Sequence, residues 1–301
     1  MSAVSPRRGS AAAWVLAIRP ATLPVGVVPV VVGAAVAWAA TGGAGFRALP
    51  VLLALACALL LQVGTNLAND VFDAEKGADT ALRLGPTRAT QSGLLAARQI
   101  RGAMVATFAL AALGGAALAL QVGWPIVAIG VASILAGVLY TGGPWPLGYH
   151  GLGDLCVMVF FGFVAVVGTS FVAAGTVPAL AWGAALPVGA LATAVLVVNN
   201  VRDRATDALA GKRTLAVRFG RRFGVAEYGV LVTLALATPV ALVAAGLARP
   251  TALASLLVLP WALASIRAVA RTDGRAMNRL LGSTARLLSV HGALFSLGVI
   301  A

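Results

Sequence analysis

Nine apolar stretches, each long enough to cross a lipid bilayer as a helix, recur along the chain between short polar breaks. A transmembrane helix needs about 20 predominantly apolar residues. The sequence therefore predicts an all-α polytopic membrane protein with nine transmembrane helices. The predicted spans are residues 13–40, 48–69, 101–120, 124–141, 152–175, 181–201, 224–246, 250–270 and 284–301.

The composition agrees with this fold class. Hydrophobic residues make up 60% of the chain and charged residues 10%, outside the usual range of soluble domains. We expect a single transmembrane domain over residues 1–301, in which residues 1–12 form a short cytoplasmic tail. The first span contains Pro20, Pro24 and Pro29, which predict a kink near Pro24 in a helix packed within a bundle.

Basic residues predict the orientation in the membrane. With the N-terminus inside, all of the 22 Lys and Arg except Arg47 and Arg249 fall on one side, as the positive-inside rule requires. The N-terminus is therefore expected in the cytoplasm. The net charge of +13 is divided among loops, which argues against a nucleic-acid partner and favours anionic lipid or an anionic substrate.

Most of the scarce acidic residues lie in two similar patterns, which hold six of the nine Asp and Glu. The patterns are Asn66-x3-Asp70-x2-Asp73, with Asp79 beyond it, and Asn199-x3-Asp203-x3-Asp207. Offsets of four and seven residues return to nearly the same face of a helix. Because both spans run toward the cytoplasm, we expect the two acidic faces to lie at one membrane depth and to face each other.

Carboxylates at this depth are costly unless they are paired or bind a cation. Carboxylate and amide oxygens suit Mg²⁺, which commonly completes its shell with water and phosphate oxygens. The patterns therefore predict Mg²⁺ as cofactor and a diphosphate as ligand. The predicted metal ligands are Asn66, Asp70, Asp73, Asp79, Asn199, Asp203 and Asp207, and the carboxylates predicted to be catalytic are Asp70, Asp73, Asp203 and Asp207.

Basic residues near both patterns could bind the phosphate oxygens. They are Arg88, Arg202, Lys212 and Arg213. For any one acid, an ordinary ion pair with a nearby Arg is the simpler interpretation, but two matching patterns favour a metal site. A cation-coupled transporter is a second alternative, although its acids more often lie near the bilayer midplane on broken helices.

The polar segments of the whole chain resemble those of the UbiA superfamily of intramembrane prenyltransferases, and within it the 1,4-dihydroxy-2-naphthoate polyprenyltransferases. Besides the two acidic patterns, the similar segments are Arg19-Pro20-x-Thr22-Leu23-Pro24, Tyr140-Thr141-Gly142-Gly143-Pro144, Gly151-Leu152-Gly153-Asp154 and Gly211-Lys212-Arg213-Thr214-Leu215-Ala216-Val217-Arg218-x-Gly220. The resemblance implies a helical bundle around a central cavity, in the bacterial cell (inner) membrane, with the active site opening to the cytoplasm.

The resemblance also implies an activity. Such an enzyme transfers an isoprenyl chain from a polyprenyl diphosphate to dihydroxynaphthoate, releases CO2 and diphosphate, and gives demethylmenaquinone in menaquinone biosynthesis. The 4-hydroxybenzoate transferases tend to have a basic residue after the Tyr equivalent to Tyr140, whereas this chain continues into Gly142 and Gly143. The alternative acceptors are 4-hydroxybenzoate, homogentisate and haem. The difference after Tyr140 argues against the first of these.

Three residues are expected to contact the acceptor. Tyr140 could orient an acceptor hydroxyl and is also a candidate catalytic residue, Arg19 could bind the acceptor carboxylate, and Asp154 could complete the site or orient a loop. The alternative interpretations are an interfacial aromatic for Tyr140 and a topology-determining charge for Arg19.

Overall fold

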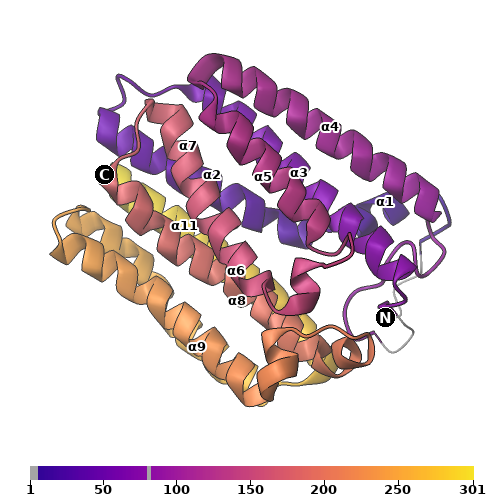
Figure 1. Cartoon of the computed structure of the whole chain (residues 1–301). Helices are drawn as coiled ribbons and strands as arrows, with labels where there is room; N and C mark the ends of the chain where they lie inside the picture. The colour runs from indigo at the N-terminus through magenta and orange to yellow at the C-terminus, as the bar shows by residue number, and fades with distance from the viewer. Residues whose placement is uncertain (1–5, 80–82) are drawn as a thin grey trace.

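The computed structural model describes residues 6–79 and 83–301, and the regular structure within them is helical throughout (Figure 1). Several segments are single helical turns or lie at breaks between longer helices. In chain order the elements are α1 (Ala11–Ile18), η1 (Pro20–Thr22), α2 (Leu23–Thr41), α3 (Ala48–Glu75), α4 (Ala97–Val122), α5 (Pro125–Leu139), η2 (Leu147–His150), α6 (Gly153–Val157), the π-helix η3 (Met158–Val164), α7 (Ala165–Ala174), α8 (Ala179–Leu209), α9 (Leu215–Ala244), η4 (Pro250–Val258), α10 (Leu259–Arg271), η5 (Gly274–Ala276) and α11 (Met277–Ile300).

The expected membrane architecture is confirmed in outline. Within the described ranges, eight helical segments are long and apolar enough to cross a bilayer, and the apolar helix α5 is shorter. Two predicted ends were placed too early, because α3 continues to Glu75 and α8 to Leu209. Hydropathy ends a span at its first polar residues. The helical backbone hydrogen bonds continue for about two further turns, so residues 66–73 and 199–207 are helical.

The first predicted span is divided, and the predicted kink near Pro24 was placed too far along the chain. The break lies at Arg19, which separates α1 from η1 and has a left-handed backbone (φ 58°). Pro20 follows it and disfavours the α conformation for the preceding residue. Pro24 instead lies in the first turn of α2, where proline is well tolerated.

Helix α8 lies inside the bundle (Figure 1), and most of its apolar stretch is buried between α2, α9, α11 and η3. Small residues permit close packing there. A Cβ added at Gly162 of η3 would lie 2.8 Å from the Gly189 Cα of α8. The backbones of η3 and α8 therefore touch at this crossing, and both η3 and α7 pack against α8. Phe160 and Phe161 of η3 line a central cavity.

Candidate active site

A cavity of about 310 Å³ lies between α2, α3, α5, η3, α7 and α8. Its lining is mostly aliphatic, which suits an isoprenoid chain. The polar residues at one end come from several elements, and they are Arg19, Gln62, Asn66, Asn69, Tyr140 and Asn199. The side chains that α3 contributes follow helical spacing, because Ala58, Gln62, Asn66 and Asn69 lie on one face. Of the predicted acidic face of α3, Asn66 lines the cavity, whereas Asp70 and Asp73 are not part of its lining.

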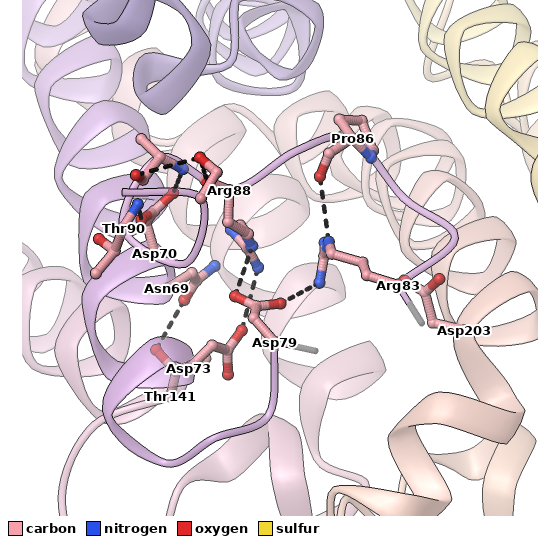
Figure 2. Close-up of polar contacts among 12 residues, drawn as sticks. Asn69, Asp70, Asp73, Asp79, Arg83, Pro86, Arg88, Thr90, Thr141 and Asp203 are labelled. Atoms are coloured by element: carbon pink, nitrogen blue, oxygen red, sulfur yellow. Dashed lines mark hydrogen bonds and ion pairs between the residues drawn. The ribbon is translucent and has the colours of Figure 1, made fainter. Parts of the chain in front are cut away.

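Asp70 organises the loop that follows α3 (Figure 2). It is buried, and its two carboxylate oxygens accept hydrogen bonds from the backbone N–H groups of Ala89 (3.0 Å) and Thr90 (2.8 Å). Carboxylate hydrogen bonds to N–H donors are charge-assisted and strong. Asp70 thus holds the loop folded back over the end of α3.

Asp73 is buried one turn further along and meets three partners. Arg88 Nη2 lies 3.1 Å from its Oδ2, Lys212 Nζ lies 3.1 Å from its Oδ1, and the Tyr149 hydroxyl donates to the same Oδ1 at 2.7 Å. Arg88 belongs to the loop after α3, whereas Lys212 follows α8. Asp73 is therefore the point where the regions around the two acidic patterns meet.

Asp79 lies in the loop after α3, between two arginines (Figure 2). Arg83 donates to its Oδ1, and Arg88 Nε lies 3.2 Å from its Oδ2. Burial raises the pKa of Asp79 to about 6, while the neighbouring Arg83 and Lys212 lower it. Arg83 and Lys212 thus favour the charged carboxylate that a divalent cation would need.

The second pattern is connected to the same loop through Arg202. Its guanidinium donates to both oxygens of Asp203 (2.8 and 2.5 Å) and to Asn278 Oδ1 (2.7 Å). Asn278 Nδ2 in turn donates to the carbonyl of Leu84 (2.9 Å). Asp207 Oδ1 lies 3.9 Å from Lys212 Nζ, and the pattern's first residue, Asn199, lines the cavity.

The structure brings most of the predicted metal ligands and cations together, and it adds a residue that the sequence did not suggest. Tyr149 packs between two lysines, with Lys76 Nζ 5.0 Å and Lys212 Nζ 4.8 Å from its ring centroid. Burial and the nearby Asp73 raise the pKa of Tyr149, so its phenol stays protonated and donates. The available signal was its position two residues before Gly151, where a segment typical of the family begins.

The predicted acceptor residues have different surroundings. Arg19 and Tyr140 line the cavity, while Asp154 accepts a 3.4 Å hydrogen bond from Asn200 Nδ2 and so ties α6 to α8. The segment after Tyr140 is held by α3, because Thr141 Oγ1 donates to Asn69 Oδ1 (2.9 Å).

Arg213, one of the four predicted diphosphate contacts, has an exposed side chain, and its backbone N–H donates to Tyr149 O (2.7 Å). Lys76, which was not predicted, donates to Thr141 O at 2.7 Å.

The donor set fits Mg²⁺ in its chemistry, since it consists of carboxylate and amide oxygens. Asn66 uses its Nδ2 on Ile18 O (2.9 Å) and Thr22 Oγ1 (3.0 Å), so its Oδ1 remains for another partner. Among the described residues, no three His, Cys, Asp or Glu side chains form a ready metal-binding group. The carboxylates instead pair with Arg and Lys side chains or accept hydrogen bonds from backbone N–H groups. The Arg and Lys side chains balance the negative charge that a metal ion would otherwise balance.

Comparison with known proteins agrees with this arrangement. A family model for the UbiA prenyltransferase family matches residues 26–290. The chain belongs to this family. A UbiA homologue from Aeropyrum pernix K1 has the same fold, with a TM-score of 0.70, 16% identity, and coverage of 90% of this chain and 96% of that one. A homologue from Archaeoglobus fulgidus bound to GPP and Mg²⁺ matches at a TM-score of 0.67 and 15% identity, covering 94% of this chain and 99% of that one.

This UbiA chain is also similar to bacterial naphthoate octaprenyltransferases. The 1,4-dihydroxy-2-naphthoate octaprenyltransferase of Mycobacterium tuberculosis is 42% identical over 84% of this chain and 85% of its own length. The 1,4-dihydroxy-2-naphthoate octaprenyltransferase of Escherichia coli is 43% identical over 69% of this chain and 68% of its own length. The similarity covers most of the chain in both cases, as the resemblance seen in its motifs had implied.

Proposed function

We propose that the protein transfers an isoprenyl chain from a polyprenyl diphosphate to 1,4-dihydroxy-2-naphthoate, with release of CO2 and diphosphate. The observation that carries this proposal is the junction of the two acidic patterns at Asp73 and Lys212, beside the polar end of an otherwise apolar cavity. The similarity to the two naphthoate octaprenyltransferases supports the choice of acceptor. The product is demethylmenaquinol, the reduced form of demethylmenaquinone.

The diphosphate end of the donor binds where the acids and bases meet. The residues that would hold Mg²⁺ are Asn66, Asp70, Asp73 and Asp79 on one side and Asn199, Asp203 and Asp207 on the other. When bound there, the metal would supply positive charge that stabilises the leaving diphosphate. The side chains that contact phosphate oxygens are Arg88, Arg202, Lys212 and Arg213. Arg88 pairs with Asp73, and the other three lie within or shortly after the second acidic pattern in the sequence.

The isoprenyl chain lies in the apolar part of the cavity. When the bond between C1 and the diphosphate oxygen breaks, an allylic cation forms that water would capture. Aliphatic walls from α2, α3, α5, α7 and α8 exclude water from that region. The same walls bind a hydrocarbon chain by burial of its surface.

The acceptor ring attacks C1 of the allylic cation with the electron pair of a ring carbon. A new carbon–carbon bond forms at the ring carbon that bears the carboxylate. The bond from that carbon to the carboxylate then breaks, CO2 leaves, and the electron pair of the bond returns to the ring, which becomes aromatic again. Arg19 and Tyr140 both line the cavity and are the proposed contacts for the acceptor carboxylate and a ring hydroxyl. The basic residues around the acidic patterns support an active site that opens to the cytoplasm, with the N-terminus on the same side.

The direct test uses purified full-length protein in liposomes with dihydroxynaphthoate, an isoprenyl diphosphate and Mg²⁺. We expect stoichiometric release of CO2 and diphosphate with formation of the prenylated naphthalenediol. Parallel reactions contain 4-hydroxybenzoate or homogentisate. Product from one of these acceptors and none from dihydroxynaphthoate would show that the proposed acceptor is wrong, while absence of product from every acceptor would contradict the activity itself.

A further inference from the structure

Gln62 carries a buried polar atom in the cavity wall that no part of the proposed chemistry yet uses. The side chain lies on α3, one helical turn before Asn66, and the residue is only 8% exposed. Its Oε1 is fully buried and has no hydrogen-bond partner among the described residues. A buried carbonyl oxygen without a donor is costly, so its retention in a lining that is mostly aliphatic points to a ligand.

The hydrogen bonds around Gln62 determine which of its two amide atoms is free. Thr22 has a single hydroxyl hydrogen, which it donates to the carbonyl of Arg19 (2.9 Å). Its oxygen must therefore accept from the amide of Gln62 (3.2 Å) and from that of Asn66 (3.0 Å). Both amides consequently direct NH2 toward Thr22, and the atom of Gln62 left over is the acceptor Oε1.

Hydrogen bonds through Thr22 connect Gln62 to the helix break at Arg19. Gln62 and Asn66 both donate to Thr22, whose hydroxyl holds the Arg19 carbonyl in place. Arg19, Thr22, Gln62 and Asn66 all line the cavity. A ligand that places an anionic group at Arg19 can therefore place a second polar group near Gln62.

Of the two substrates, only the aromatic acceptor can donate a hydrogen bond at this position. An isoprenoid chain has no hydrogen-bond donor, and an ionised diphosphate has none to offer. A dihydroxy aromatic acid carries two phenolic O–H donors besides its carboxylate. Resting on the proposed function, we propose that Gln62 Oε1 accepts a hydrogen bond from a ring hydroxyl of the aromatic acceptor, and that Gln62 is a specificity-determining residue for a hydroxylated ring.

The first measurement uses Gln62→Met, which keeps the length of the side chain and removes the amide. We expect the KM for dihydroxynaphthoate to rise about tenfold, the effect of one lost hydrogen bond, while the KM for isoprenyl diphosphate stays within twofold. Gln62→Asn, whose carbonyl is withdrawn by one methylene, is expected to raise the same KM. Gln121→Met is the matched control, because Gln121 is exposed near the end of α4 and does not line the cavity, and it should leave both KM values unchanged.

A second measurement separates recognition from a structural role. The inhibition constants of 1-hydroxy-2-naphthoate and 4-hydroxy-2-naphthoate, which each lack one hydroxyl, are measured against wild type and Gln62→Met. For the analogue that lacks the recognised hydroxyl, the substitution should have no effect, whereas it weakens the other analogue about tenfold. Equal weakening of both, or of neither, would overturn the role of Gln62. If wild-type protein prenylates the naphthoate, that result leaves the proposed function intact, whereas a wild type that neither binds nor prenylates it would remove both.

Discussion

Lys212 Nζ lies 3.1 Å from Asp73 Oδ1 and 3.9 Å from Asp207 Oδ1, so one ammonium group contacts a carboxylate from each acidic pattern. The side chain of Asp73 is 2% exposed and that of Lys212 is 14% exposed, which limits screening of the pair by water. Because Asp73 also pairs with Arg88, the proposed metal ligands and the proposed diphosphate contacts are each other's partners in this structure. Substrate and metal would bind by exchanging these ion pairs.

Lys212→Met should weaken diphosphate binding more than acceptor binding. Loss of a buried charge-assisted contact is expected to raise the KM for isoprenyl diphosphate at least tenfold, and Lys212→Arg should recover part of the loss. Steady-state kinetics with each substrate varied in turn provides the measurement. Arg271→Met, at an exposed position at the end of α10, is the control for loss of a basic charge. An unchanged KM in Lys212→Met would remove Lys212 from the diphosphate site.

Tyr149 is predicted to act through both its hydroxyl and its ring. Tyr149→Phe removes the 2.7 Å hydrogen bond to Asp73 and keeps the ring between Lys76 and Lys212. We expect kcat/KM to fall about tenfold, since hydrogen bonds to charged groups are worth about 1.5–3 kcal/mol. Tyr149→Leu also removes the cation–π contacts and should reduce kcat/KM further. Full activity of Tyr149→Leu would show that the residue only fills space.

Within the described residues, hydropathy was enough to predict the apolar helices in outline, and Asp70, Asp73, Asp203 and Asp207 lie on helices as expected. Asn66, Asp70 and Asp73 share one side of α3 because four- and seven-residue offsets do so on any helix. The left-handed break at Arg19 was not predictable in the same way, since three prolines follow it and each could end a helix. Its position depends on Thr22 being held by Gln62 and Asn66, which are distant in sequence.

The partners of the acids were also beyond the reach of spacing. Tyr149 meets Asp73 only because the segment after α5 folds back over the end of α3, and that path is determined by contacts such as Thr141 with Asn69. A sequence pattern reports periodicity within one helix and contains no information on which loop crosses it. Residues on helices were therefore predicted more readily than the loop residues that complete the site.

Mg²⁺ should stabilise the wild-type protein together with an isoprenyl diphosphate, because a ligand that binds only the folded state raises its stability. The measurement is the Tm in detergent with Mg²⁺ and diphosphate or with EDTA. In Asp203→Ala we expect the Mg²⁺-dependent rise in Tm to disappear together with turnover. In Asp70→Ala the metal-free Tm should fall as well, since Asp70 holds the backbone of Ala89 and Thr90. A full Mg²⁺ response in both variants would contradict the metal site.

Gly162→Ala should destabilise the crossing of η3 and α8. The added Cβ would lie 2.8 Å from Gly189 Cα and 2.9 Å from Ala185 O, and backbone cannot move aside as a flexible side chain can. Overpacking of this kind costs about 1–3 kcal/mol, so we expect a lower Tm. Gly102→Ala in α4 is the control, because a Cβ there meets nothing within 4 Å. A Tm unchanged in Gly162→Ala would show that the two helices can separate freely.

Arg19 allows the role of its side chain to be separated from that of its backbone. Among the described residues it is the only non-glycine residue with a positive φ, 58°. Such a conformation costs an ordinary residue about 1–2 kcal/mol and costs glycine little. Arg19→Gly and Arg19→Ala both remove the guanidinium, so both should raise the KM for dihydroxynaphthoate at least tenfold.

The two variants should differ in stability, with Arg19→Gly unfolding at a higher Tm than Arg19→Ala by the equivalent of about 1 kcal/mol. Arg19→Lys keeps the positive charge and should restore part of the acceptor binding, although it lacks the planar guanidinium. Thermal unfolding and acceptor kinetics on the same preparations provide both measurements. If the acceptor KM followed Tm across the three variants, Arg19 would act only by shaping the turn between α1 and α2; a raised KM in the more stable Arg19→Gly would instead assign the effect to its guanidinium.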